Sequence, residues 1–109
     1  MSCAEHSQEE LTRAWYESEE GRIKTIKGIL RRLGYQNVRS TEAISGEKLH
    51  LISGSYEGED NSTHGAFVSY FCKERERIEI SAKRGRAERI ERMIKKELPQ
   101  VDCRIESTF

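Results

Sequence analysis

The sequence predicts a single α+β domain, in which two helices pack on one face of a mostly antiparallel sheet in the order α-β-β-β-β-α-β. Three observations predict this fold. Apolar residues recur at helical spacing near both ends of the chain, and four runs of strand-forming residues lie between them. The connections between those runs are short enough for hairpins. A length of 109 residues fits one hydrophobic core.

The composition limits the class of protein. No apolar run approaches the roughly 20 residues that a membrane span needs, and the start of the chain lacks the basic and apolar regions of a signal peptide. Three widely spaced cysteines do not make a disulfide framework. We therefore expect a cytoplasmic protein with reduced thiols and no contact with a membrane.

The charge is distributed unevenly, although the net charge is zero. Residues 1–20 contain six acidic residues and one arginine, which gives −5 and leaves +5 for the rest of the chain. We expect residues 1–7 to form a flexible acidic leader and residues 8–109 to form the domain. Such an asymmetry can accompany a nucleic-acid surface.

The first helix should start near residue 8, because Ser7 and Glu10 fit a capping box. Gly21 weakens its middle, so one long helix and two shorter pieces are both open. Gly34 should end it, because glycine readily adopts the left-handed conformation that closes a helix. The apolar stripe of this segment consists of Leu11, Ala14, Trp15, Ile23, Ile26, Ile29, Leu30 and Leu33.

The middle of the chain should form antiparallel strands. Strand-like runs span residues 38–44, 48–56, 66–72 and 77–82. Turn-forming or polar residues separate them, and connections of this length favour hairpins between neighbours.

A second helix should run from about residue 86 to 98, where Ala87, Ile90 and Ile94 share one face before Pro99 stops it. Residues 101–105 then alternate between apolar and polar side chains, as a half-buried strand does. Because a helix connects the two strands, residues 77–82 and 101–105 should pair in parallel.

The leading functional prediction concerns the second face of the sheet. The run 66–72 is apolar on both sides, and two helices usually cover only one side of so small a sheet. We expect the uncovered face to bind a second copy or another protein. The alternative is that the segment around Trp15 covers this face. The expected interface residues are Ile52, Tyr56, Val68 and Tyr70.

An alternative function is binding to the phosphate backbone of a nucleic acid. The two helices should each carry cations opposite their apolar stripe, and a helix amino terminus with a glycine favours phosphate. Pairs such as Glu91 with Lys95 would instead neutralise this surface. The candidate residues are Lys83, Arg84, Arg86, Arg89 and Lys96, together with Lys24, Lys27 and Arg31.

Catalytic and metal-binding residues do not form a recognisable motif. Cys3 and His6 have a spacing compatible with metal ligands, but no matching second pair follows. His64 lies beside polar and acidic residues that a solvated hairpin explains equally well. We therefore predict no cofactor and no metal, and we favour a non-catalytic binding or regulatory module that forms a homodimer.

Overall fold

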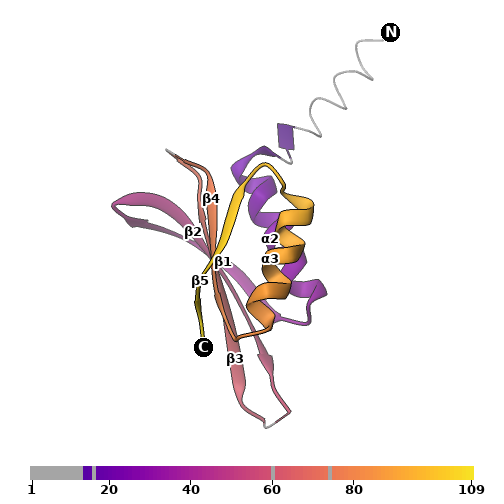
Figure 1. Cartoon of the computed structure of the whole chain (residues 1–109). Coiled ribbons are helices and arrows are strands. Elements are labelled where there is room, and N and C mark those ends of the chain that lie inside the picture. Colours follow the sequence, from indigo (N-terminus) through magenta and orange to yellow (C-terminus); the bar gives the residue numbers. More distant parts are fainter. Residues whose placement is uncertain (1–13, 16, 60, 74) are drawn as a thin grey trace.

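The computed structural model describes residues 14–15, 17–59, 61–73 and 75–109. Its elements follow the predicted order (Figure 1). They are helix α2 (Glu19–Arg32), strands β1 (Gln36–Ser45), β2 (Glu47–Glu57), β3 (Thr63–Phe71) and β4 (Arg77–Ala82), helix α3 (Arg86–Glu97) and strand β5 (Asp102–Thr108). The predicted leader and the capping box at residues 7–10 lie outside the described residues.

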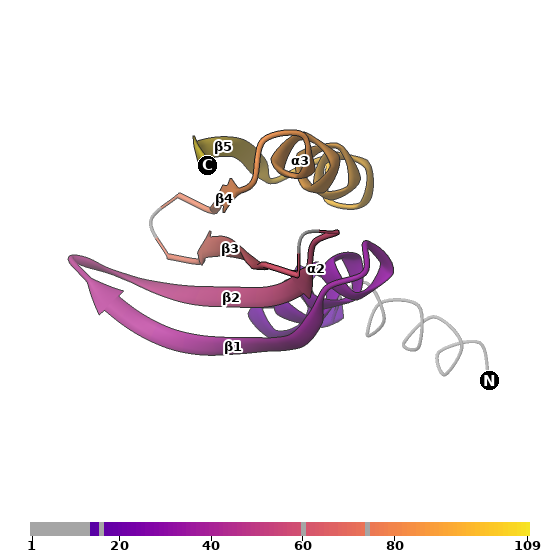
Figure 2. The same ribbon diagram turned by 90° about the horizontal axis from the view of Figure 1, so that it is seen from below.

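The five strands form one sheet in the order β1-β2-β3-β4-β5. The first three pairs are antiparallel, and β4 pairs with β5 in parallel, as the intervening helix predicts. Helices α2 and α3 lie side by side on one face of this sheet (Figures 1 and 2). Neither is long and apolar enough to cross a membrane, nor is any other helix in the described part of the chain.

Helix α2 has clear start and stop signals. Ser18 is its N-cap, and the Ser18 hydroxyl accepts a hydrogen bond from the Gly21 amide at 3.1 Å. At the other end Gly34 has a φ of +93°, and the Tyr35 amide donates to the Leu30 carbonyl at 3.0 Å. The predicted end is confirmed. Of the two alternatives for this segment, the structure shows a break, which lies at Ser18 and not at Gly21.

The hydrophobic core lies between the helices and the sheet. Ile52, Val68 and Ile80 are neighbours across β2, β3 and β4, and all three are fully buried. Ile26 and Ile90 cover them from the two helices and are also fully buried. Burial of each such side chain contributes about 1.5–3 kcal/mol to folding before entropy is counted.

A polar network is buried at one end of this core. The Tyr70 hydroxyl donates to the Glu76 carboxylate at 2.5 Å, and the Arg22 guanidinium lies 3.5 Å from the same carboxylate. Arg22 is only 6% exposed, so its charge needs this partner. Burial, followed by the Glu76 carboxylate, raises the pKa of Tyr70. The network ties α2 to the end of the β3–β4 connection.

Candidate functional site

The four residues predicted for the protein interface lie beneath the helices. Ile52 and Val68 are fully buried and Tyr70 is 1% exposed. Tyr56 is half-buried and packs edge-on against Tyr35, with ring centroids 5.4 Å apart. The prediction that these residues form the uncovered face is therefore wrong.

Small side chains on the covered face let the residues after α2 approach the sheet closely. Gly54 and Ala66 are opposite each other on the covered face, in the same strands as Ile52 and Val68. A Cβ atom on Gly54 would lie 3.0 Å from the Tyr35 Cβ, so the residues after α2 approach the sheet closely there. Small residues admit this approach, whereas the opposite face of β3 carries the bulky Phe67.

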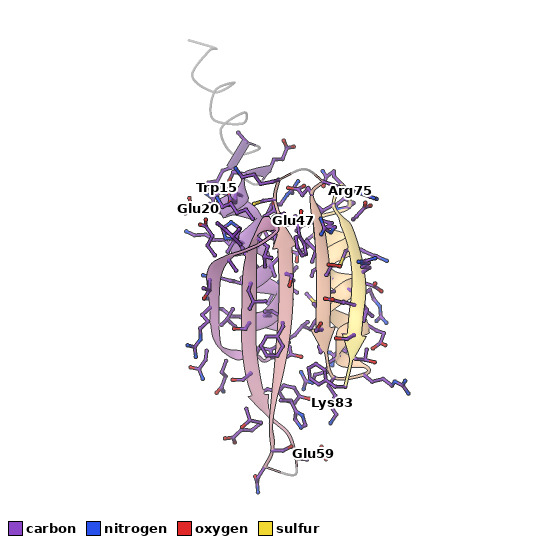
Figure 3. The ribbon with its side chains drawn as sticks, turned by 90° about the vertical axis from the view of Figure 1, so that its left-hand side faces the viewer. Trp15, Glu20, Glu47, Glu59, Arg75 and Lys83 are labelled. Carbon is purple, nitrogen blue, oxygen red and sulfur yellow. The ribbon has the colours of Figure 1, made fainter. Side chains whose placement is uncertain are left out.

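The uncovered face of the sheet has an apolar half on β1, β2 and β3 (Figure 3 views this face directly). Leu49 lies opposite Phe71, and Leu51 and Phe67 are diagonal neighbours on the same face. Phe67 is 43% exposed and Leu51 is 37% exposed. The apolar half consists of Ala43, Leu49, Leu51, Phe67 and Phe71.

The other half of this face is ionic and internally neutralised. Three arginines each place one nitrogen 2.5 to 2.7 Å from a carboxylate oxygen. The Arg77 guanidinium also covers the ring of Phe71 at 3.8 Å. The pairs are Arg77 with Glu47, Arg104 with Glu79, and Arg75 with Asp102.

Trp15 does not cover the uncovered face. Its ring lies near the Lys24 ammonium, which is 5.9 Å from the ring centroid, on the helix side of the molecule. Together with Arg32 and Leu98 it lines a groove of about 620 Å³ beside the two helices. Trp15 itself therefore does not shield the second face, and residues 1–13 and 16 of this segment lie outside the described residues.

The predicted phosphate position at the start of α3 is already occupied by a side chain. The Gly85 amide donates to the Glu88 carboxylate at 2.6 Å. Arg86 turns inward, where its guanidinium lies 3.5 Å from the centroid of the Tyr56 ring and donates to the Leu33 carbonyl. These two contacts remove an amide and a cation from the expected anion site.

The remaining predicted cations are spread along the length of the molecule. Lys24 pairs with Glu20 at one end of the molecule, whereas Lys83 lies at the opposite end (Figure 3). The predicted pair between Glu91 and Lys95 is present at 3.6 Å. Exposed cations from the predicted set are Lys24, Arg31, Lys83, Arg84, Arg89 and Lys96, and Lys27 is half-buried.

His64 is placed at the end of the β2–β3 hairpin. Its Nε2 atom lies 2.8 Å from the Ser62 hydroxyl oxygen, and its ring packs against Tyr56 at 5.1 Å. These contacts account for its orientation through packing.

A second cluster of chemically active side chains lies where α2 meets the sheet. The ligand-type atoms of Glu19, His50 and Cys72 all lie within 4.8 Å of one another. His50 is hydrogen-bonded to Glu19, and the Cys72 thiol donates to the same carboxylate oxygen at 3.4 Å. The Lys48 ammonium approaches that oxygen at 3.1 Å.

The electrostatics of this cluster centre on the Glu19 carboxylate. Hydrogen bonds from His50, and then from Lys48, lower the pKa of Glu19 to about 2. Burial, followed by the hydrogen bond to Glu19, raises the pKa of Cys72. Glu19 is therefore ionised at neutral pH, while Cys72 is a protonated thiol.

Sequence reasoning missed this cluster because its members come from three separate elements. Glu19 and His50 are 31 positions apart, and Glu19 and Cys72 are 53 positions apart. No local spacing of the metal-ligand kind links them. The uncovered sheet face and this cluster are the two candidate sites. The chain matches no protein-family model, no curated protein and no solved structure, so both sites are judged on their geometry.

Proposed function

We propose that this protein is a non-catalytic binding or regulatory module that forms a homodimer through the uncovered face of its sheet. The observation that carries the proposal is the exposure of Leu51 and Phe67 as neighbours on that face. Contiguous apolar patches on a protein surface often mark a contact with another protein. Aromatic side chains such as Phe67 are enriched in such contacts.

A second copy of the chain suits this face. The net charge is zero, so two copies do not repel each other at long range. The arginines of the ionic half already have carboxylate partners, so sheet-to-sheet contact would not bury them unpaired. A two-fold contact places the same patch on itself, with the two sheets about 10 Å apart.

Sedimentation equilibrium tests the proposal with two single substitutions. We expect the wild-type chain to be a dimer and Phe67→Glu to be a monomer, because a buried carboxylate in the contact would lack a partner. Ile44→Glu is the matched control. Ile44 is 79% exposed and lies on the other side of the sheet, so this variant should remain a dimer.

Two results would contradict the dimer. One is a wild-type chain that stays monomeric at its solubility limit, and the other is a Phe67→Glu variant that still forms the dimer. Circular dichroism of both variants checks that the fold persists, because each substituted side chain is exposed.

Binding to a phosphate backbone is the alternative that the same samples test. Lys83 and Arg84 are adjacent and exposed, and they precede helix α3. Affinity for duplex DNA would then fall by about 0.9 log units per log unit of salt for each phosphate contact. Two results together would favour nucleic-acid binding over the homodimer. One is a gel shift at low salt that is lost in the double variant Lys83→Glu/Arg84→Glu, and the other is a monomeric wild-type chain.

A further inference from the structure

We propose that Glu19, His50 and Cys72 bind a zinc ion, with a fourth coordination position open to solvent. Zinc takes carboxylate oxygen, imidazole nitrogen and thiolate sulfur as ligands, and these three side chains offer one of each. The site lies on the helix side of the sheet. It is therefore independent of the proposed dimer contact.

The fold fixes the orientation of two of the ligands. His50 and Tyr70 are cross-strand partners on β2 and β3, and their rings stack with an interplanar angle of 22°. His50 is only 8% exposed, so its ring has little freedom. Cys72 is the first residue after β3 and follows Tyr70 by two positions, so the alternation of the strand directs it to the same side. The imidazole and the thiol therefore face the same space above the sheet.

The third ligand comes from the first turn of α2. Glu19 follows the N-cap residue Ser18, whose hydroxyl bond to the Gly21 amide fixes the start of the helix. The first turn thus holds the carboxylate against His50 on β2 and against Cys72 just after β3. Three elements distant in sequence meet here, and each contributes one donor atom.

The spacing of the sulfur and oxygen donor atoms fits a tetrahedral ion. Zinc–sulfur and zinc–oxygen bonds of ordinary length place the two donor atoms about 3.6 Å apart. The Cys72 Sγ and Glu19 Oε1 atoms are 3.4 Å apart. An ion would replace the hydrogen bond between His50 and Glu19, so these two donor atoms would have to move apart to about 3.4 Å on binding. The thiol would lose its proton to solvent.

The donor set selects against the common hard cations. Magnesium and calcium prefer sites made of oxygen atoms alone, whereas thiolate and imidazole favour zinc. A groove of about 510 Å³ borders the site, lined in part by Ile23, Lys27, Ser40 and His50. This groove gives solvent a route to the fourth position.

Lys48 competes with the ion for Glu19. Its ammonium lies 3.1 Å from Glu19 Oε1 and 3.6 Å from a Glu42 oxygen, so it has a second partner when it leaves the first. A positive charge beside a divalent cation weakens binding. Removing it in Lys48→Gln should tighten zinc binding on the order of tenfold, from Coulomb repulsion at about 5 Å in a water-like dielectric.

The experiment is a zinc titration of the full, reduced chain in competition with a chromogenic chelator. Cobalt is the spectroscopic substitute, because a cobalt–thiolate bond gives a charge-transfer band. We expect one zinc ion per chain, at least about 100-fold weaker binding in Cys72→Ser and Glu19→Gln, and tighter binding in Lys48→Gln. Cys103→Ser, which changes a half-buried thiol on β5, is the matched control and should bind as the wild type does.

Several outcomes would overturn the zinc site. They are no stoichiometric zinc binding, unchanged affinity in Cys72→Ser, or binding that is lost in Cys3→Ser and kept in Cys72→Ser. His50→Ala removes a buried ring and is judged only if circular dichroism shows a native fold. Glu19 and Cys72 are both partly exposed, so we expect Glu19→Gln and Cys72→Ser to fold. These two variants test the zinc site even if His50→Ala does not fold. A failed zinc titration leaves the sedimentation result unaffected.

Discussion

Tyr70 illustrates how one polar atom can decide the role of a residue. The sequence pattern assigned it to a protein interface, yet its ring is buried and its hydroxyl donates to Glu76. That carboxylate also pairs with the buried Arg22. A hydrogen bond to a charged group is worth more than one between neutral groups. Tyr70 is therefore a structural residue whose hydroxyl helps to hold a buried charge in place.

Tyr70→Phe tests this role by removing one oxygen and keeping the ring. We expect the free energy of unfolding to fall by about 1.5–3 kcal/mol, measured by urea denaturation. Tyr35→Phe is the control, because the Tyr35 hydroxyl is buried and donates to no acceptor among the described residues. That variant should be neutral or slightly more stable. If the free energy of unfolding fell equally in both variants, the hydrogen bond to Glu76 would not be what stabilises Tyr70.

Cys103 gives a prediction for alkaline pH. Burial, and then the Glu91 charge, raises its pKa from 9.0 to about 11. The folded state therefore holds the proton more tightly than the unfolded state does. This contribution to stability is complete below pH 9 and is lost as the pH rises towards 11. The free energy of unfolding in urea, measured at several pH values, should fall more steeply between pH 9 and 11 for the wild type than for Cys103→Val. If it fell equally in both proteins, the raised pKa of Cys103 would be contradicted.

At the scale of elements, the sequence predicted those helix and strand boundaries that are set by a local residue type. The strand and helix boundaries agree with the predicted runs to within a few residues, because Gly34 and Pro99 stop the helices and short polar connections separate the strands. The start of α2 was less predictable. Both Ser7 and Ser18 are suitable caps, and only Ser18 lies within the described residues.

Gly54 offers a test of the close approach between the sheet and the residues after α2. A methyl group there would meet the Tyr35 Cβ at 3.0 Å and the Val38 Cγ2 at 3.2 Å. We expect Gly54→Ala to lower the free energy of unfolding by about 1–3 kcal/mol in thermal denaturation. Gly28→Ala is the control: nothing lies within 4 Å, and alanine favours a helix by up to about 1 kcal/mol. A Gly54→Ala variant that is more stable than the wild type would contradict this, because it would show that Tyr35 and Val38 can move away from β2 without cost.

At the scale of the whole molecule, the sequence left open which face of the sheet the helices cover. Strand β3 is apolar on both sides, so its own pattern cannot decide. The pattern of β4 is clear, with Ile78 and Ile80 on one side and Glu79 on the other, and Val68 is the partner of Ile80. To carry the pattern of β4 over to β3, one must know which residues of the two strands are paired. The connection at residues 72–76 sets this register, and sequence spacing alone does not fix it. The Glu19 cluster was hidden for the same reason, because only the tertiary arrangement assembles it.

The position of β5 at the margin of the sheet has a consequence for aggregation. Its parallel pairing covers β4, whose free backbone groups would otherwise be a template for another chain. The bond from Arg104 to Glu79 links the two strands, and the bond from Arg75 to Asp102 anchors the start of β5. Concentrated salt screens such surface attractions. If β5 detached, the edge of β4 would be exposed, and molecules could then polymerise by pairing their strands edge to edge.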